Sequence, residues 1–430
     1  MSDHSYSPDV HLNLNIRGMG LSATLAINER SQELAAQGKK VHKLGLGQSP
    51  FPVPRHVQQA LRDNAYQKDY LPVKGLPALR GAVADYLKRT EGLDFDSHDI
   101  LIGPGTKELM FLVQLTYYGD LVIPTPSWVS YAPQAQIIGR RIQWLPTNIA
   151  TGLGVTPEAI DRLCATDPTR PRLLILNSPS NPTGLSYSEA QLQEIAAVAR
   201  KYKLLLLSDE IYSGCHYQGE HISIARYYPE GTIISNGLSK WCGAGGWRIG
   251  AFAFPSSLRW LLQSMADVAS ETYTSVSAPT QYAAVVGFAD HPDMERYLRH
   301  SRNILGALAQ HIGDKLQQAG ATLKPPGGGF YIFPNFSGCE PALQQRGIQS
   351  SMQMCTQLLD DTGVAVLPGS VFGRPQEEMS CRLAFVDFDG EAALDALYAK
   401  DAAVDEGFLR EYCESVMTGI DKLCEWVKGD

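Results

Sequence analysis

Short apolar runs alternate with amphipathic stretches between about residues 56 and 300 of the chain. The amphipathic stretches, such as Ser188–Lys201, carry apolar residues at helical spacing. The apolar runs have the length of buried strands and lie at Asp99–Ile102, Leu121–Ile123, Leu173–Leu176, Leu204–Leu207, Thr232–Ser235 and Ile249–Phe254. Alternating strands and helices are typical of α/β proteins, so we predict a mostly parallel sheet that helices cover on both faces.

The two ends of the chain have a different pattern. Residues 1–20 are polar and irregular and are expected to form an arm, and a helix is predicted over Ser22–Gln37 with a stop at Gly38. Beyond residue 300 the pattern is that of an α+β unit. It consists of a long helix, short strands and two closing helices, with the helix and strands at Tyr297–Ala319, Phe330–Phe333, Gly363–Leu367 and Arg382–Val386.

A chain of 430 residues is too long for one ordinary core, so we expect two domains. The large domain is predicted to span residues 56–305. Residues 306–430 are predicted to form a smaller α+β domain, to which residues 1–55 contribute an arm and one part.

Composition and charge narrow the classes of function. Hydrophobic residues make up 44% of the chain and charged residues 19%, as in soluble globular proteins. The net charge of -8 disfavours nonspecific binding to nucleic acid or to anionic membranes. No apolar run is long enough to cross a bilayer, and no secretory signal opens the chain. We therefore expect a cytoplasmic enzyme.

The cysteines and histidines give no metal-binding pattern. The eight cysteines form no CxxC pair, and the ten histidines show no HExxH or other ligand spacing. Reduced thiols and no metal site are the expectation.

Polar residues follow several of the predicted strands. In open α/β sheets, ligands bind beyond the carboxyl ends of the strands. Asn181 follows the third predicted strand, Asp209 and Tyr212 follow the fourth, and Lys240 follows the fifth. Gly105-Thr106-Lys107 follows the first and opens a helix. These groups are therefore predicted to meet at one edge of the sheet.

The chemistry of these groups points to one kind of ligand. The helix start at Gly105–Lys107 suits a phosphate, and Arg248 could add a bidentate clamp. Asp209 could stabilise a protonated ring nitrogen, while Asn181 and Tyr212 could bind a ring oxygen. Lys240 could capture a carbonyl group as an activated amine. A phosphorylated pyridine aldehyde with a ring oxygen meets all of these demands, so we predict pyridoxal 5′-phosphate as the cofactor.

The stretch Gly237–Gly250 resembles the Schiff-base lysine signature of the class I/II aminotransferases. The chain is also similar to that family at Asn181-Pro182-Thr183-Gly184, at Asp209 with Tyr212, and at Arg382. The order and spacing hold over roughly residues 20–395. This resemblance implies fold type I of the pyridoxal-phosphate enzymes, with a large sheet domain and a smaller α+β domain, and a homodimer with active sites at the subunit interface.

The resemblance also implies roles for individual residues. Lys240 would bind the cofactor and shuttle a proton at the substrate α-carbon, and Asp209 would keep the pyridine nitrogen protonated. Arg382 would grip the substrate α-carboxylate, with the Gly47 backbone nearby. The other positions that match are Asn181 and Tyr212 at the ring 3-oxygen, Trp128 stacked on the ring, Gly105, Thr106, Lys107, Ser239 and Arg248 at the phosphate, and Tyr70, which would reach the phosphate in the neighbouring subunit.

Two positions depart from the family pattern. Gly237 stands where some members carry a phosphate-binding serine, so one hydroxyl contact is missing. No second arginine is evident for a substrate side-chain carboxylate, which leaves a preference for dicarboxylates open.

The reading favoured by the sequence is amino-group transfer from an L-amino acid to a 2-oxo acid by a ping-pong mechanism. A C–S lyase or a cyclising synthase on the same fold is the alternative, because both use the same lysine and phosphate site. A pyridoxal-phosphate-sensing transcriptional regulator is disfavoured, since the N-terminal arm is too short for a DNA-binding module and the net charge is negative.

Overall fold

The computed structural model describes residues 13–17, 19, 23–400 and 403–429. Most of the arm predicted at residues 1–20 and the first residue of the helix predicted from Ser22 lie outside the described residues. The described part of that helix is α1, Ala23–Ala36. No helix among the described residues is long and apolar enough to cross a membrane.

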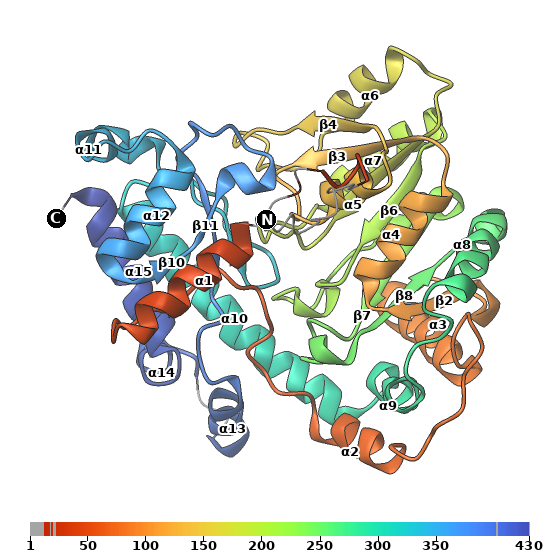
Figure 1. Cartoon of the computed structure of the whole chain (residues 1–430). Coiled ribbons are helices and arrows are strands. Elements are labelled where there is room, and N and C mark those ends of the chain that lie inside the picture. Colours follow the sequence, from red (N-terminus) through yellow and green to blue (C-terminus); the bar gives the residue numbers. More distant parts are fainter. Residues whose placement is uncertain (1–12, 18, 20–22, 401–402, 430) are drawn as a thin grey trace, which may run out of the picture.

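A seven-stranded sheet forms the centre of the larger part of the molecule (Figure 1). Its strand order is β2-β8-β7-β6-β5-β3-β4, and β8 alone runs antiparallel to its neighbours. The strands are β2 (Ile100–Pro104), β3 (Asp120–Thr125), β4 (Ile142–Pro146), β5 (Arg172–Asn177), β6 (Leu205–Asp209), β7 (Thr232–Gly237) and β8 (Ile249–Ala253). The predicted mostly parallel sheet is confirmed.

The sequence pattern missed strand β4. This strand lies at the edge of the sheet, where only Leu145 is buried and Trp144 is 46% exposed. Its other side chains are exposed or only partly buried, so its sequence lacks the continuous apolar run that marked the other six strands, including the buried strand β2 at the opposite edge.

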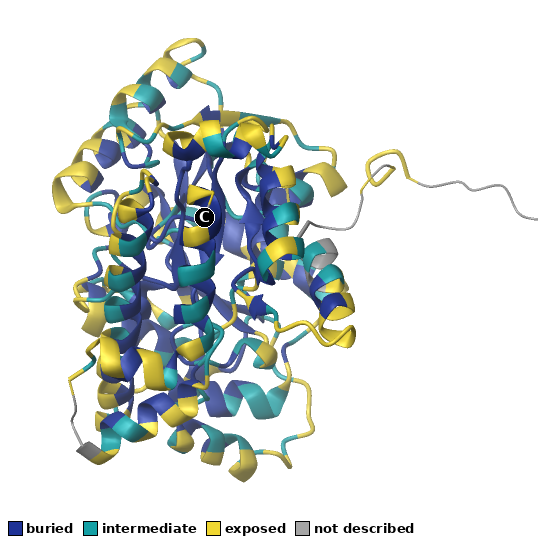
Figure 2. Cartoon of the chain, turned by 90° about the vertical axis from the view of Figure 1, so that its left-hand side faces the viewer, coloured by how far each residue is buried: buried dark blue, intermediate teal, exposed yellow. Residues whose placement is uncertain are grey.

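Helices cover both faces of the sheet, as predicted. Leu173 and Ile175 of β5 pack on the face that α4 (Thr106–Thr116), α5 (Tyr131–Ile137) and α8 (Arg259–Glu271) cover. Leu174 and Leu176 of the same strand point to the other face, where α6 (Pro157–Ala165) and α7 (Glu189–Lys201) pack. Alternate side chains of one strand thus belong to two separate hydrophobic cores, one on each face of the sheet. Figure 2 shows that buried positions gather in the interior of the molecule and that the surrounding helices carry partly exposed positions.

The second part of the molecule contains two small sheets. β11 (Leu367–Pro368), β12 (Cys381–Ala384) and β9 (Tyr331–Ile332) pair antiparallel, and β1 (His42–Lys43) pairs parallel with β10 (Val364–Ala365). The β1–β10 pairing ties the N-terminal segment to the C-terminal part of the chain. The remaining helices are α2 (Arg55–Asp63), α3 (Pro77–Glu91), α9 (Ala278–Phe288), α10 (Pro292–Gln318), α11 (Glu340–Gln345) and α12 (Ser351–Thr362).

Helix α10 runs between the two parts, and the boundary expected at residue 305 falls inside it. The chain closes with three helices where the sequence predicted two: α13 (Gly390–Lys400), α14 (Glu406–Tyr412) and α15 (Glu414–Lys428). The last two are separated only at Cys413, whose backbone leaves the helical region. A break of one residue leaves little trace in the hydrophobic pattern.

Candidate active site

The carboxyl ends of β5, β6 and β7 place the predicted polar residues next to one another. Asn177 pairs in register with Asp209, and Asp209 pairs with Ser235. The segments that follow these strands carry Asn181, Tyr212 and Lys240. The parallel register therefore brings them to one edge of the sheet, as the sequence indicated.

Asp209 is a buried carboxylate with two hydroxyl partners. The Tyr131 hydroxyl donates to Oδ2 over 2.6 Å, and the Ser235 hydroxyl lies 3.3 Å from Oδ1. Burial raises the pKa of Asp209 to about 6, although the hydrogen bonds and the charge of Lys240 oppose this rise. Asp209 forms no ion pair with any residue that the structure describes. A buried carboxylate of this kind suits a cationic ligand atom.

Lys240 projects its amine toward the 45–47 segment. Its Nζ donates a hydrogen bond of 3.1 Å to the Gly47 carbonyl oxygen. The amine also lies 5.7 Å from the centre of the Tyr212 ring and 5.8 Å from that of Phe330. The amine is therefore held between the N-terminal segment and two aromatic rings.

Tyr331 joins Tyr212 to the same segment. The two hydroxyl oxygens lie 2.9 Å apart, and the Tyr331 hydroxyl donates to the Gly47 carbonyl oxygen over 3.5 Å. A Cβ atom on residue 47 would collide with the Tyr331 hydroxyl. Glycine at this position is thus required by the approach of Tyr331 to the backbone.

Arg382 is a buried cation without an acidic partner. Its guanidinium lies between the rings of Tyr331 and Phe372, 4.7 and 5.0 Å from their centres. It donates to Oδ1 of Asn181 over 3.1 Å and to the Gly45 carbonyl oxygen over 2.5 Å.

The Nε atom of Arg382 has no hydrogen-bond partner among the described residues. Burial lowers the pKa of the guanidinium, and no described carboxylate forms an ion pair with it. An anionic ligand would satisfy both the charge and the free N–H group.

The start of α4 faces Arg248. Gly105 precedes the helix with a φ of 84°, and the first N–H groups of α4 have no acceptor within the helix. Arg248 donates to the Gly245 and Pro104 carbonyl oxygens over 2.9 and 3.4 Å. A Cβ on residue 105 would collide with the guanidinium. The helix N-terminus and Arg248 therefore form one site for an anion.

Packing explains the glycine at position 237. A Cβ atom there would lie 2.6 Å from the Ile249 carbonyl oxygen on the adjacent strand β8. No side chain fits without moving the strand. The missing serine is thus a consequence of close strand packing in this chain.

Lys107 and Trp128 contact each other beside this anion site. The Lys107 amine lies 5.0 Å from the centre of the Trp128 ring, which packs edge-on against Tyr131 at 5.3 Å. Desolvation lowers the pKa of Lys107, and the charges of Arg248 and Lys240 add to this effect. The three cations are therefore close enough to interact.

Two predicted residues are not drawn into this cluster. Tyr70 is 90% exposed, so its ring does not enter the site of its own chain. Ser239 is partly buried next to Lys240.

The sequence analysis did not predict three residues of the site, which are Tyr131, Tyr331 and Asn177. Tyr131 follows Trp128 by three residues and is the first residue of α5.

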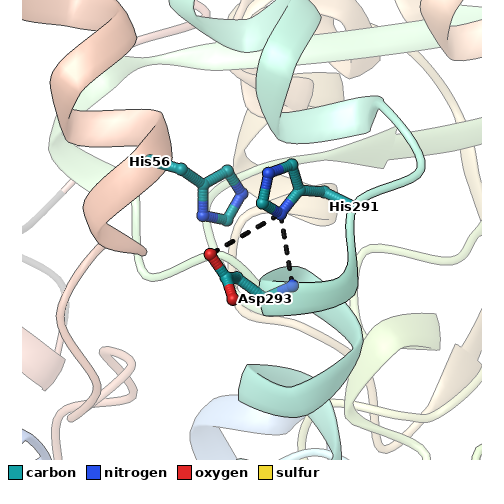
Figure 3. Close-up of side chains that lie close together, drawn as sticks. All are labelled: His56, His291 and Asp293. Carbon is teal, nitrogen blue, oxygen red and sulfur yellow. Dashed lines mark hydrogen bonds and ion pairs between the residues drawn. The ribbon is translucent and has the colours of Figure 1, made fainter.

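A separate group of possible metal ligands lies at the start of α10 (Figure 3). His56 of α2 stacks on His291 with ring centres 4.3 Å apart. Nδ1 of His291 accepts a hydrogen bond of 3.2 Å from the Asp293 backbone N–H and lies 3.8 Å from the Asp293 carboxylate. The imidazole thus serves as the N-cap of α10.

The residues at the sheet edge fit pyridoxal phosphate. The anion site at α4 suits its phosphate, and the unpaired Asp209 carboxylate suits a protonated ring nitrogen. The Lys240 amine, directed into the same space, suits its aldehyde. The site therefore has a donor or acceptor for each polar group of the cofactor.

Comparison with known proteins identifies the family of the chain. Residues 39–389 match the sequence model of the family "Aminotransferase class I and II". The chain is 34% identical over 389 residues to an aspartate aminotransferase of Geobacillus stearothermophilus, covering 87% of this chain and 93% of that protein. It is 31% identical over 382 residues to an asparagine–oxo-acid transaminase of Streptococcus mutans, covering 85% and 93%.

The fold agrees as well. The aspartate aminotransferase of Thermus thermophilus with maleate superimposes with a TM-score of 0.82 at 27% identity, covering 97% of this chain and 100% of that one. These similarities do not favour a lyase or a cyclising synthase. The chain belongs to the class I and II aminotransferases of fold type I, which transfer amino groups with pyridoxal 5′-phosphate.

Proposed function

We propose that Lys240 and Arg382 are the two residues that handle the α-amino and α-carboxylate ends of an L-amino acid. The observation that carries this proposal is their shared anchorage. Lys240 Nζ binds the Gly47 carbonyl oxygen, and the Arg382 guanidinium binds the Gly45 carbonyl oxygen. An amine and a carboxylate receptor therefore lie on the same short segment, which is the arrangement that an α-amino acid requires.

Pyridoxal phosphate, when bound, supplies an aldehyde that accepts the amino group and a ring that withdraws electrons. Asp209 would provide the negative charge that holds a proton on the ring nitrogen, and Asn181 and Tyr212 would hold the ring oxygen. Trp128 would pack on the ring. Lys240 would carry the proton to and from the substrate α-carbon, because its amine lies beside the Gly47 carbonyl and the Tyr212 ring.

The phosphate is held by the start of α4 and its neighbours. The backbone of Gly105, Thr106 and Lys107 donates N–H groups, and Ser239 and Arg248 complete the set. The positive φ of Arg248, 56°, turns its side chain back toward the Pro104 carbonyl and the helix start. An anion at this position would neutralise the mutual repulsion of Arg248, Lys107 and Lys240.

The substrates follow from the family and from the names of relatives. An L-amino acid donates its amino group to a 2-oxo acid by a ping-pong mechanism. Relatives named aspartate aminotransferase and asparagine–oxo-acid transaminase make L-aspartate and L-asparagine the first donors to test.

A homodimer in the cytoplasm completes the proposal. Tyr70 has no place in the site of its own chain, because it is 90% exposed. An exposed tyrosine on a loop before α3 is available to a second subunit, where it would reach the phosphate. Sedimentation tests whether the protein is a dimer. The activity of dimers mixed from Tyr70→Phe and Lys240→Ala subunits tests whether Tyr70 contributes to the neighbouring active site.

The visible absorption spectrum tests the central assignment. Wild-type protein loaded with pyridoxal phosphate should turn yellow, lose its band with an amino acid and regain it with a 2-oxo acid. Lys240→Ala should abolish turnover, whereas Lys88→Ala at an exposed ion pair should not. Undiminished transamination by the Lys240 variant would refute the assignment. Release of pyruvate without an oxo-acid acceptor would instead indicate a lyase.

A further inference from the structure

A cluster of three buried ionisable residues lies directly behind the site. Glu210 follows Asp209, Glu91 ends helix α3, and His221 lies on the loop between residues 216 and 223. Their exposed fractions are 1%, 5% and 8%. The ligand atoms of the three lie within 4.8 Å of one another. None of these residues has a role in the chemistry proposed above.

Hydrogen bonds and an ion pair indicate the charges of His221 and Glu91. Nε2 of His221 lies 3.1 Å from the Ser178 carbonyl oxygen, which can only accept, so Nε2 carries a proton. Nδ1 lies 2.7 Å from Oε1 of Glu91. The other Glu91 oxygen accepts from the Ser223 backbone N–H over 2.9 Å and forms an ion pair with Arg226 at 3.0 Å, and this cationic partner favours the carboxylate form of Glu91. His221 therefore donates from both nitrogens and is an imidazolium.

The pKa directions agree with this assignment. Burial alone would lower the pKa of His221, but the Glu91 hydrogen bond and the charges of Glu210 and Glu91 outweigh it and raise the pKa. Burial raises the pKa of Glu210 to about 7, with Glu91 adding to the rise and His221, Ser223 and Ser208 opposing it. The cluster thus centres on the ion pair between His221 and Glu91.

The hydrogen bond from His221 to the Ser178 carbonyl oxygen holds the turn that carries Asn181. The Ser178 backbone N–H donates to the Asp209 carbonyl oxygen over 3.2 Å, and its carbonyl accepts from His221. The Asn181 N–H in turn donates to Oδ1 of Asn177 over 2.6 Å. Both peptide groups of Ser178 are therefore fixed, three residues before the Asn181 side chain that binds Arg382.

We propose that His221 is a positioning residue for amino-group transfer. Its imidazolium, anchored on Glu91, holds the Ser178 carbonyl and so fixes the turn that presents Asn181 to the cofactor and to Arg382. This inference rests on the proposed role of Asn181. It assigns a function to an ion pair that would otherwise serve stability alone.

A double-mutant cycle on the cofactor-loaded enzyme tests the proposal. The variants are His221→Gln, Asn181→Ala and the double variant. The measurements are the KM for the amino acid and the pH at which the visible band of the bound cofactor changes. His221→Gln should raise KM several-fold and shift the band transition in the same direction as Asn181→Ala. It should have no further effect in the Asn181→Ala background, because its influence passes through Asn181.

Asp99→Asn is the matched control. Asp99 is 3% exposed and forms a two-point ion pair with Arg259 at 2.5 and 2.9 Å, away from the site. This variant should lower the thermal midpoint without moving KM or the band. Glu91→Gln keeps the volume of the side chain and should shift both readouts less than His221→Gln, which provides the test if the latter does not fold.

Two results would overturn the positioning role. One is a His221→Gln enzyme that is less stable but has unchanged KM and band transition. The other is full additivity of His221→Gln and Asn181→Ala. Failure of the proposed function itself is distinguishable, because wild-type protein would then show no amino-acid-dependent change of the band at all.

Discussion

Tyr131 donates a hydrogen bond of 2.6 Å to Oδ2 of Asp209, and the two side chains are 1% and 4% exposed. This bond lowers the pKa of Asp209 against the opposing effect of burial. The tyrosine thus helps to keep Asp209 in the ionised form that a protonated ring nitrogen requires.

Tyr131→Phe should therefore weaken cofactor binding. Losing a hydrogen bond to a charged group costs roughly 1.5–3 kcal/mol. The pKa of Asp209 should rise above its value of about 6, so the acid limb of cofactor binding should move to higher pH. Cofactor dissociation, followed by fluorescence between pH 5 and 8, measures both effects. An unchanged pH profile would show that Tyr131 only fills space.

Removal of Arg382 should reduce kcat/KM for every amino acid. The guanidinium is buried and has no acidic partner among the described residues, so the substrate carboxylate would be left without its counter-charge. Truncation of one partner of a buried charge pair costs about 2–5 kcal/mol. We expect a fall of that size in Arg382→Ala, measured by single-turnover kinetics with several donors.

Arg172→Lys is the control for this experiment. Arg172 is also fully buried, but its Nη1 donates to the carbonyl oxygens of Asp167 and Arg170. Its replacement should change stability and leave kcat/KM unaltered. Equal losses in both variants would argue against a substrate contact at Arg382.

Gly237→Ser should destabilise the protein without improving phosphate binding. Its Cβ would meet the Ile249 carbonyl oxygen at 2.6 Å, and forcing extra atoms into a packed strand costs about 1–3 kcal/mol. Urea unfolding measures the loss. Gly81→Ala in helix α3 is the matched control, since nothing lies within 4 Å of its Cβ. That change should stabilise the protein by about 0.5–1 kcal/mol.

The stability of the cofactor-free protein should fall as pH rises from about 4 to about 6 through Asp209. The pKa of Asp209 is about 6 in the folded chain and has an ordinary value of 3.8. The folded state therefore binds the extra proton in this window, and stability is lost as that proton leaves. The difference amounts to about 3 kcal/mol.

Comparison with Asp209→Asn isolates this effect, because Glu210 titrates in the same direction. The difference between the two proteins in unfolding free energy should change across pH 4–6. Added cofactor should reduce that dependence, since it gives Asp209 a cationic partner. A difference that is flat with pH would contradict the raised pKa.

Local signals in the sequence predicted most of the sheet and the residues at its edge. Six of the seven strands were recognised from their apolar runs because both of their faces are buried, and four of them, β2, β5, β6 and β7, lead into polar residues that are assigned to the site. Strand β4 was not predicted because it contains no continuous apolar run. The break at Cys413 was not predicted because it does not interrupt the apolar pattern of the flanking helices. Tyr331 and Asn177 escaped because their roles depend on partners that are 119 and 32 residues away.

The sequence by itself determined the fold class, the family and the chemical kinds of residue at the sheet edge. These depend on spacing and residue type, which the linear chain carries. Only the tertiary structure decided that Lys240 and Arg382 share the Gly45–Gly47 segment, that Tyr131 bonds Asp209, and that His221 clamps Ser178. Hydrogen bonds between residues distant in sequence depend on how the elements pack, and burial then decides which of these groups are charged.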